Sequence, residues 1–137
     1  MNSDHQTLVE LLDELERICK MAAVDVGQCG QCPGEQMLAC HAMLRALCGR
    51  MQALLLDHFE REHELMNMLP PTQEARSHCA RHRREHVNFS TQYNTAAKRL
   101  QGCEPVIGAR EMEALVIDWV RGHALEYDLE LSALLKT

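Results

Sequence analysis

Between residues 75 and 100, apolar and histidine side chains recur at alternating steps of four and three positions. This period matches one face of an α-helix, because side chains at i, i+3 and i+4 lie on the same side of the helix. The face holds imidazoles at two positions where leucine would be expected. It reads Ala75, Cys79, His82, His86, Phe89, Tyr93, Ala96 and Leu100. The pattern predicts a helix that turns polar side chains toward a protein core.

Three further segments space their apolar residues in the same way. They are about residues 3–27, residues 36–69 and a segment that begins near Ala109. Strand signals are weak, because β-branched residues are few and no alternating run is bounded by hairpin turns. Amphipathic helices joined by short loops favour an up-down-up-down arrangement. The sequence therefore predicts an all-α, antiparallel four-helix bundle that forms a single domain over residues 1–137.

Helix-ending residues separate these segments. Pro70 and Pro71 should end the second helix, since proline lacks a backbone N–H and cannot continue it. Thr72 can cap the third helix, and Gly102 can close it. The turn-rich stretch over residues 28–35 is expected to form the loop between the first two helices.

The second helix also has polar residues on its apolar face. The expected face consists of Leu44, Leu47, Met51, Leu54, His58, Glu62, Leu65 and Leu69. Burial of a histidine and a glutamate is costly unless each is paired or bound to something. His58 and Glu62 are therefore candidates for a functional site. His41 lies too far along the helix to join them and is expected to be a surface or packing residue, and His63 lies off this face and is expected to be solvated.

The charge and composition of the chain exclude several classes of function. A formal net charge of −6 gives no basic footprint for nucleic acid or for an anionic membrane. No segment approaches the roughly 18 apolar residues that a membrane span needs. The N-terminal residues show no signal peptide. We therefore expect a cytoplasmic protein in which the seven cysteines are mostly thiols. The sequence does not indicate an oligomeric state.

The candidate ligands should meet at one level of such a bundle. His5 and His58 lie at nearly equal sequence distances from the centre of the first loop, so folding the chain there places them side by side. The second and third loops likewise bring Glu62 level with His82 and His86, and these level with His123. Imidazole nitrogens with carboxylate oxygens are the ligand set expected for a redox-active pair of iron or manganese ions.

Two positions leave alternatives. Asp128 follows His123 by five residues, which amounts to about 140° of rotation on an ideal helix. A π-type widening of that turn would bring Asp128 onto the same face, whereas by phase Glu126 and Glu130 are rival carboxylates. His78 precedes His82 by four residues, so either neighbour could pair with His82. We favour His86, because Phe89 continues the apolar face beyond it.

Four segments of the chain resemble the motifs of the hemerythrin family. These are DHQTLVELLDEL (residues 4–15), DHFEREHELM (57–66), HRREHVNF (82–89) and WVRGHALEYD (119–128). The third resembles the HxxxHxxF motif of that family and the fourth its WxxxHxxxxD motif. Together they cover nearly the whole chain in the family's order.

The resemblance implies a non-haem diiron site that binds dioxygen, with an oxo or hydroxo group between two iron ions. Carried over residue by residue, it implies five terminal imidazole ligands and two bridging carboxylates: His5, His58, His82, His86 and His123, with Glu62 and Asp128 as the bridges. It also favours Asp128 over its rivals. Storage, delivery or sensing of dioxygen is the function it predicts.

Two other functions are consistent with the same residues. The site could serve a diiron oxidoreductase that acts on peroxide or nitric oxide. Alternatively, the Cys29-Gly-Gln-Cys32 segment could report redox state to a partner protein, although it lacks the βαβ context of a thioredoxin site. The sequence shows no catalytic acid, base or substrate cleft beyond the candidate metal ligands, which ranks the enzyme second.

Overall fold

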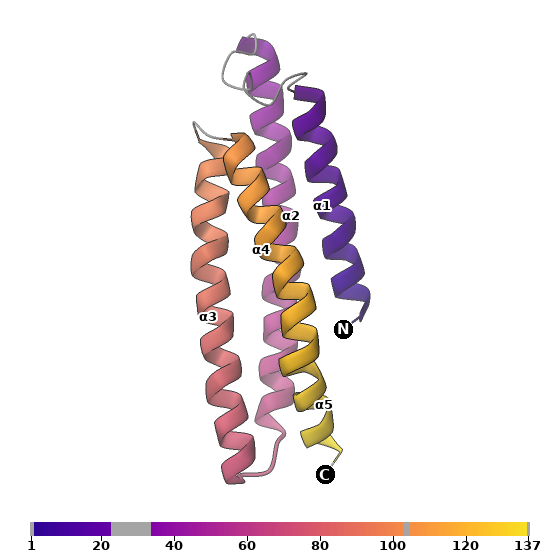
Figure 1. The fold of residues 1–137 in the computed structure, drawn as a ribbon, viewed down its shortest axis with the longest axis vertical. Coiled ribbons are helices and arrows are strands. Elements are labelled where there is room, and N and C mark those ends of the chain that lie inside the picture. The colour runs from indigo at the N-terminus through magenta and orange to yellow at the C-terminus, as the bar shows by residue number, and fades with distance from the viewer. Residues whose placement is uncertain (1, 23–33, 103–104, 137) are drawn as a thin grey trace.

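The computed structural model describes residues 2–22, 34–102 and 105–136. Its helices run antiparallel and side by side along one long axis (Figure 1). In chain order they are α1 (Asn2–Ala22), α2 (Gly34–Asn67), α3 (Gln73–Gln101), α4 (Pro105–His123), the π-helical turn η2 (Ala124–Asp128) and α5 (Leu129–Leu135). The last three follow one another directly and together form the fourth rod of the bundle.

The predicted all-α, up-down-up-down bundle is confirmed, and the described ranges contain no strand. The fourth helix begins at Pro105 rather than near Ala109. Proline suits the first turn of a helix, where its missing N–H has no intrahelical partner in any case. None of the helices in the described ranges is both long and apolar enough to cross a membrane. Most of the predicted first loop lies outside the described residues.

Both predicted helix ends of α3 are confirmed. The Thr72 hydroxyl accepts a hydrogen bond of 3.1 Å from the backbone N–H of Ala75, which satisfies a donor that the first turn leaves free. At the other end, the backbone N–H of Gly102 donates to the carbonyl of Arg99 at 3.2 Å. These caps fix where α3 starts and stops, and so fix the height of its histidines in the bundle.

Leucines of α1 and α2 and aromatic residues of α3 and α4 fill most of the core, among them Leu8, Leu15, Leu44, Met51, Phe89, Tyr93 and Trp119. Tyr93 is buried there, and its hydroxyl donates to the carbonyl of Cys48 at 3.1 Å. The hydrogen bond joins α3 to α2. Most of this apolar core therefore lies toward the end of the bundle where α1 and α3 end.

After Met51 the predicted inner face of α2 is confirmed at His58 and Glu62 but wrong at its leucines. Leu54, Leu65 and Leu69 are only half-buried, and Leu55 and Met66 are buried instead. The reason lies in the neighbours of α2. Helix α1 runs toward the other end of the bundle, and its first turn lies well short of the α2–α3 connection (Figure 1), so the last turns of α2 lack that neighbour. The buried side of a helix follows its partners, and a spacing of three or four residues fits either choice.

Helices α3 and α4 approach each other closely at Gly108. A Cβ atom at this position would lie 2.3 Å from the backbone nitrogen of Leu100 and 2.7 Å from its Cα atom. Both atoms belong to backbone and cannot move without displacing the helix. Only glycine therefore allows the first turn of α4 to pack this closely against the backbone of α3.

We expect Gly108→Ala to destabilise the metal-free protein by about 2–3 kcal/mol, because the added methyl group forces the two helices apart. Gly49→Ala is the matched control. That position is exposed in α2, and a methyl group there would meet no other part of the protein within 4 Å. Alanine at residue 49 should therefore stabilise the helix by roughly 0.5–1 kcal/mol. Urea unfolding followed by circular dichroism measures both. Equal stability of the two variants would contradict the close approach.

Candidate metal centre

Every buried polar or charged residue in the described ranges belongs to one cluster. The residues are His58, Glu62, His78, His82, His86, His123 and Asp128. They come from α2, α3, α4 and η2, and the half-buried His5 of α1 joins them through a 3.4 Å contact between its Nε2 atom and Oδ2 of Asp128. All four rods of the bundle thus contribute to one layer, as the sequence predicts.

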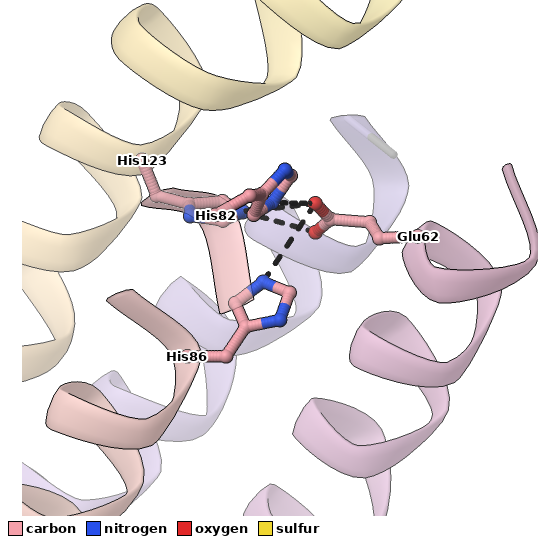
Figure 2. Close-up of side chains that lie close together, drawn as sticks. All are labelled: Glu62, His82, His86 and His123. Atoms are coloured by element: carbon pink, nitrogen blue, oxygen red, sulfur yellow. Dashed lines mark hydrogen bonds and ion pairs between the residues drawn. The ribbon is translucent and has the colours of Figure 1, made fainter. Parts of the chain in front are cut away.

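Glu62 stands at the centre of this cluster and is fully buried. Its carboxylate lies 2.9 and 3.2 Å from Nε2 of His123. It is also in close contact with Nε2 of His58 and of His82, and Nε2 of His86 lies 3.8 Å away. Figure 2 shows the imidazoles of His82, His86 and His123 turned toward this carboxylate from two neighbouring helices. One carboxylate therefore faces four imidazoles.

Two overlapping groups of side chains could each hold a metal ion. One group consists of Glu62, His82, His86 and His123, and the other of His58, Glu62, His123 and Asp128. Within each group, one nitrogen or oxygen atom per residue lies within 4.8 Å of the others. Six of the seven residues predicted as ligands fall into these groups, and His5 borders the second one. Glu62 and His123 belong to both.

The turn that contains Asp128 is π-helical, which confirms the predicted widening. It brings Oδ1 of Asp128 to 2.9 Å from Nε2 of His123. Of the rival carboxylates, Glu126 is exposed, and Glu130 faces His78 and Arg81 instead of Glu62. A wider turn lets a residue five positions on occupy the face that a regular helix gives to the fourth.

The charges within the cluster are set by its carboxylates. Burial would raise the pKa of Glu62, but hydrogen bonds from His123, His58 and His82 outweigh it and hold that pKa far below its usual range. Burial likewise opposes protonation of His123, yet Asp128, Glu62 and Glu85 together raise its pKa to about 11. Without a cation, the cluster thus keeps a proton on His123, and a bound metal ion would take the place of that positive charge.

The sequence as a whole matches a known family. The description of that family is the hemerythrin HHE cation-binding domain, and its model matches residues 1–135. The chain belongs to this family. Neither the curated proteins nor the solved structures include a match to it. Membership accounts for the observed bundle and for a cation site within it.

The side chains of this hemerythrin domain fit such a cation. Nε2 of His86 is buried and makes no hydrogen bond within the described residues, and burial lowers the pKa of this histidine to about 3. The ring is therefore neutral and keeps a lone pair. Both oxygens of Asp128 are buried and approach imidazole nitrogens without the geometry of a hydrogen bond. Unused lone pairs that converge in a buried place are what a metal ion would satisfy.

Aromatic rings cover the layer. The ring of Phe59 stacks on His86, with 4.0 Å between centroids, and Trp119 stacks on His123 at 4.4 Å. Tyr127, in the π-helical turn, lies against His123 and His82 at 5.6 and 5.2 Å. On the side of α2 and α3, a groove of about 780 Å³ has Phe59 and His86 in its wall. Within the buried cluster, His86 is the residue that lines this groove.

The structure adds residues that sequence reasoning missed. The carboxylate of Glu85 lies 2.7 Å from Nδ1 of His123, on the side away from Glu62. His63, expected to be solvated, is half-buried, and its Nε2 atom lies 3.4 Å from Nδ1 of His86. Neither residue lies on the apolar face of its helix, so periodicity gave no signal for them. Cys29 and Cys32 lie outside the described residues, as does the side chain of His41.

His78 does not belong to either candidate metal group. It is fully buried in α3, but its Nε2 atom faces His82 at 3.0 Å rather than Glu62. The sequence left open whether His78 or His86 pairs with His82, and His86 is the one that belongs to the first group. The geometry therefore favours the predicted pairing of His82 with His86.

Proposed function

We propose that this hemerythrin domain holds two non-haem iron ions, joined by an oxo or hydroxo bridge, and binds dioxygen reversibly. The observation that carries the proposal is the pair of overlapping groups that share Glu62 and His123. A carboxylate has two oxygens and can serve two neighbouring ions at once. Two ions rather than one account for a buried cluster that draws side chains from every rod of the bundle.

The proposed ligands are the seven residues predicted from the sequence: His5, His58, Glu62, His82, His86, His123 and Asp128. In this assignment Glu62 and Asp128 bridge, and the imidazoles are terminal. The central place of Glu62 among four imidazoles supports its role. The approach of Asp128 to both His123 and His5 supports a bridge at the other side.

Iron(II) ions supply electrons to dioxygen and can recover them, which a redox-inactive cation cannot do. The chain provides the surroundings for that exchange. The stacked rings of Phe59 and Trp119 shield two of the imidazoles from water. A dry site keeps protons and water away from the bound gas and so slows irreversible oxidation. This exclusion of water favours reversible binding over turnover.

A diiron oxidoreductase acting on peroxide or nitric oxide is the second candidate. The observation in its favour is the groove between α2 and α3, because Phe59 and His86 form part of its wall. A small reactant could approach the cluster from that side. The groove also suits the entry of dioxygen, so the two functions differ in what happens after binding.

Exposure to air distinguishes these functions. Protein loaded with iron(II) without oxygen should be colourless, develop a visible charge-transfer absorption in air, and lose it again when dioxygen is removed. Absorption spectra over repeated cycles, with iron content measured before and after, provide the test. Zinc-loaded protein should stay colourless throughout. Irreversible oxidation in the first cycle would overturn the proposal of a carrier and favour the oxidoreductase.

A further inference from the structure

Behind His82 lies a chain of polar contacts that leads away from the proposed metal site. His78 precedes His82 by one turn of α3, and its Nε2 atom lies 3.0 Å from Nδ1 of His82. Its other ring nitrogen, Nδ1, lies 3.4 Å from Oε1 of Glu130 on α5. The Arg81 guanidinium lies 2.8 Å from the same oxygen and holds it in place. Glu130, His78 and His82 are thus connected in series from the partly exposed carboxylate to the buried cluster.

The carboxylate at the outer end of this series determines where the protons lie. Nδ1 of His78 faces the carboxylate of Glu130 at 3.4 Å without the geometry of a hydrogen bond, and a carboxylate, which offers only lone pairs, favours the hydrogen on the ring nitrogen that faces it. Between His78 and His82 one ring nitrogen donates and the other accepts, and a hydrogen on Nδ1 of His78 leaves its Nε2 atom as the acceptor. Nε2 of His78 then has a lone pair and accepts a hydrogen bond from Nδ1–H of His82. Nε2 of His82, which contacts Glu62, is then the ring nitrogen that can be given to a metal ion.

We propose that His78 and Glu130 are positioning residues that fix the orientation and tautomer of His82 so that its Nε2 atom is available to a metal ion. The inference rests on the proposed metal site and adds residues that lie outside both candidate metal groups. Second partners of this kind orient a ligating histidine and raise its basicity. Glu130 does not contact His82 itself. It acts on His82 through the imidazole of His78, which lies between the two residues.

A neighbouring histidine supports this interpretation. His123 also has a carboxylate on its outer nitrogen, since Glu85 lies 2.7 Å from its Nδ1 atom. Glu85 is close enough in space to act directly, whereas Glu130 acts through His78. Two histidines that face Glu62 therefore have a carboxylate on the side of the outer ring nitrogen, in contact with His123 and beyond His78 for His82.

The test compares His78→Leu with His78→Gln, each loaded anaerobically with iron(II) in competition with a chelator. Leucine removes the acceptor for Nδ1–H of His82, and we expect the affinity for one of the two ions to fall roughly 10- to 100-fold. The reduction midpoint potential of the loaded site should rise, because a less basic ligand stabilises iron(III) less. Glutamine keeps an acceptor at this position, so it should restore most of the affinity and of the potential.

Glu130→Gln should shift the potential in the same direction by a smaller amount, because an amide can donate as well as accept and no longer dictates the tautomer. Glu126→Gln, an exposed carboxylate two residues before Asp128, is the matched control and should change neither quantity.

Circular dichroism checks that each variant folds. Unchanged affinity and potential in His78→Leu would overturn the proposal. So would loss of an ion in His78→Gln as complete as in His78→Leu, since this result would identify His78 as a ligand. Affinity and potential are measured without dioxygen, so failure of reversible binding would leave this test intact.

Discussion

Replacing Glu62 with glutamine is expected to reduce iron binding from two ions per chain to one at most. The Glu62 carboxylate is fully buried and belongs to both candidate metal groups. His123 is the other residue that belongs to both groups. Glutamine has nearly the same shape but carries no charge and offers a single acceptor oxygen. Two cations held side by side would then lose one of the anions between them. Iron analysis after anaerobic loading and desalting measures the effect.

Glu64→Gln is the matched control for this substitution. Glu64 lies two residues further along α2 and is exposed, so the same change of charge occurs on the same helix without touching the cluster. It should bind as much iron as the unaltered protein. If Glu62→Gln also retained two ions, the central role of this carboxylate would be refuted.

The positions of the histidines could be predicted because they depend on local geometry. The rise of an α-helix is constant, so sequence distances to the loops place His5, His58, His82 and His123 at one level once the helices are antiparallel. The structure brings these residues together in one layer. The five-residue spacing left the widened turn at Asp128 as one alternative beside Glu126 and Glu130, and the resemblance to the family favoured the alternative that the structure shows.

The inner face of α2 could not be predicted in the same way. After Met51, the sequence offers apolar residues at neighbouring positions, such as Leu54 and Leu55, and helical spacing suits both choices. The structure buries Leu55 and leaves Leu54 half-buried. Which of them is buried depends on where α1 and α3 lie, which is a property of the assembled bundle rather than of one helix.

The carboxylates that contact the outer ring nitrogens of His123 and His78 could not be predicted from the sequence either. Glu85 looks like any acidic residue on the solvated face of α3, and Glu130 appeared as a rival ligand. In the folded chain, Glu85 reaches His123 across a helix interface, and Glu130 reaches His78. Such contacts join residues far apart in the chain and off the periodic face. Ligand types can thus be predicted from spacing, whereas the groups that orient them require the structure.

The second large effect is expected for Asp128→Asn, which should remove one of the two proposed iron ions. Asp128 belongs only to the group with His58, Glu62 and His123, and both of its oxygens are buried. Asparagine keeps the shape of the side chain and the π-helical turn, but it replaces an anionic oxygen with an amide that binds iron poorly. The group with His82 and His86 stays complete, so one ion should remain. Iron analysis and the loss of the visible absorption in air measure the change.

Glu126→Gln separates the role of Asp128 from the charge of the π-helical turn. Both carboxylates lie in the same turn, but Glu126 is exposed and Asp128 is buried against His123 and His5. The control should therefore keep both ions and the absorption. If the turn were a regular helix in solution, Glu126 would come nearer the ligand face and Asp128 would point away. The two variants would then exchange their effects, and such an exchange would disprove the widened turn as well as the ligand role of Asp128.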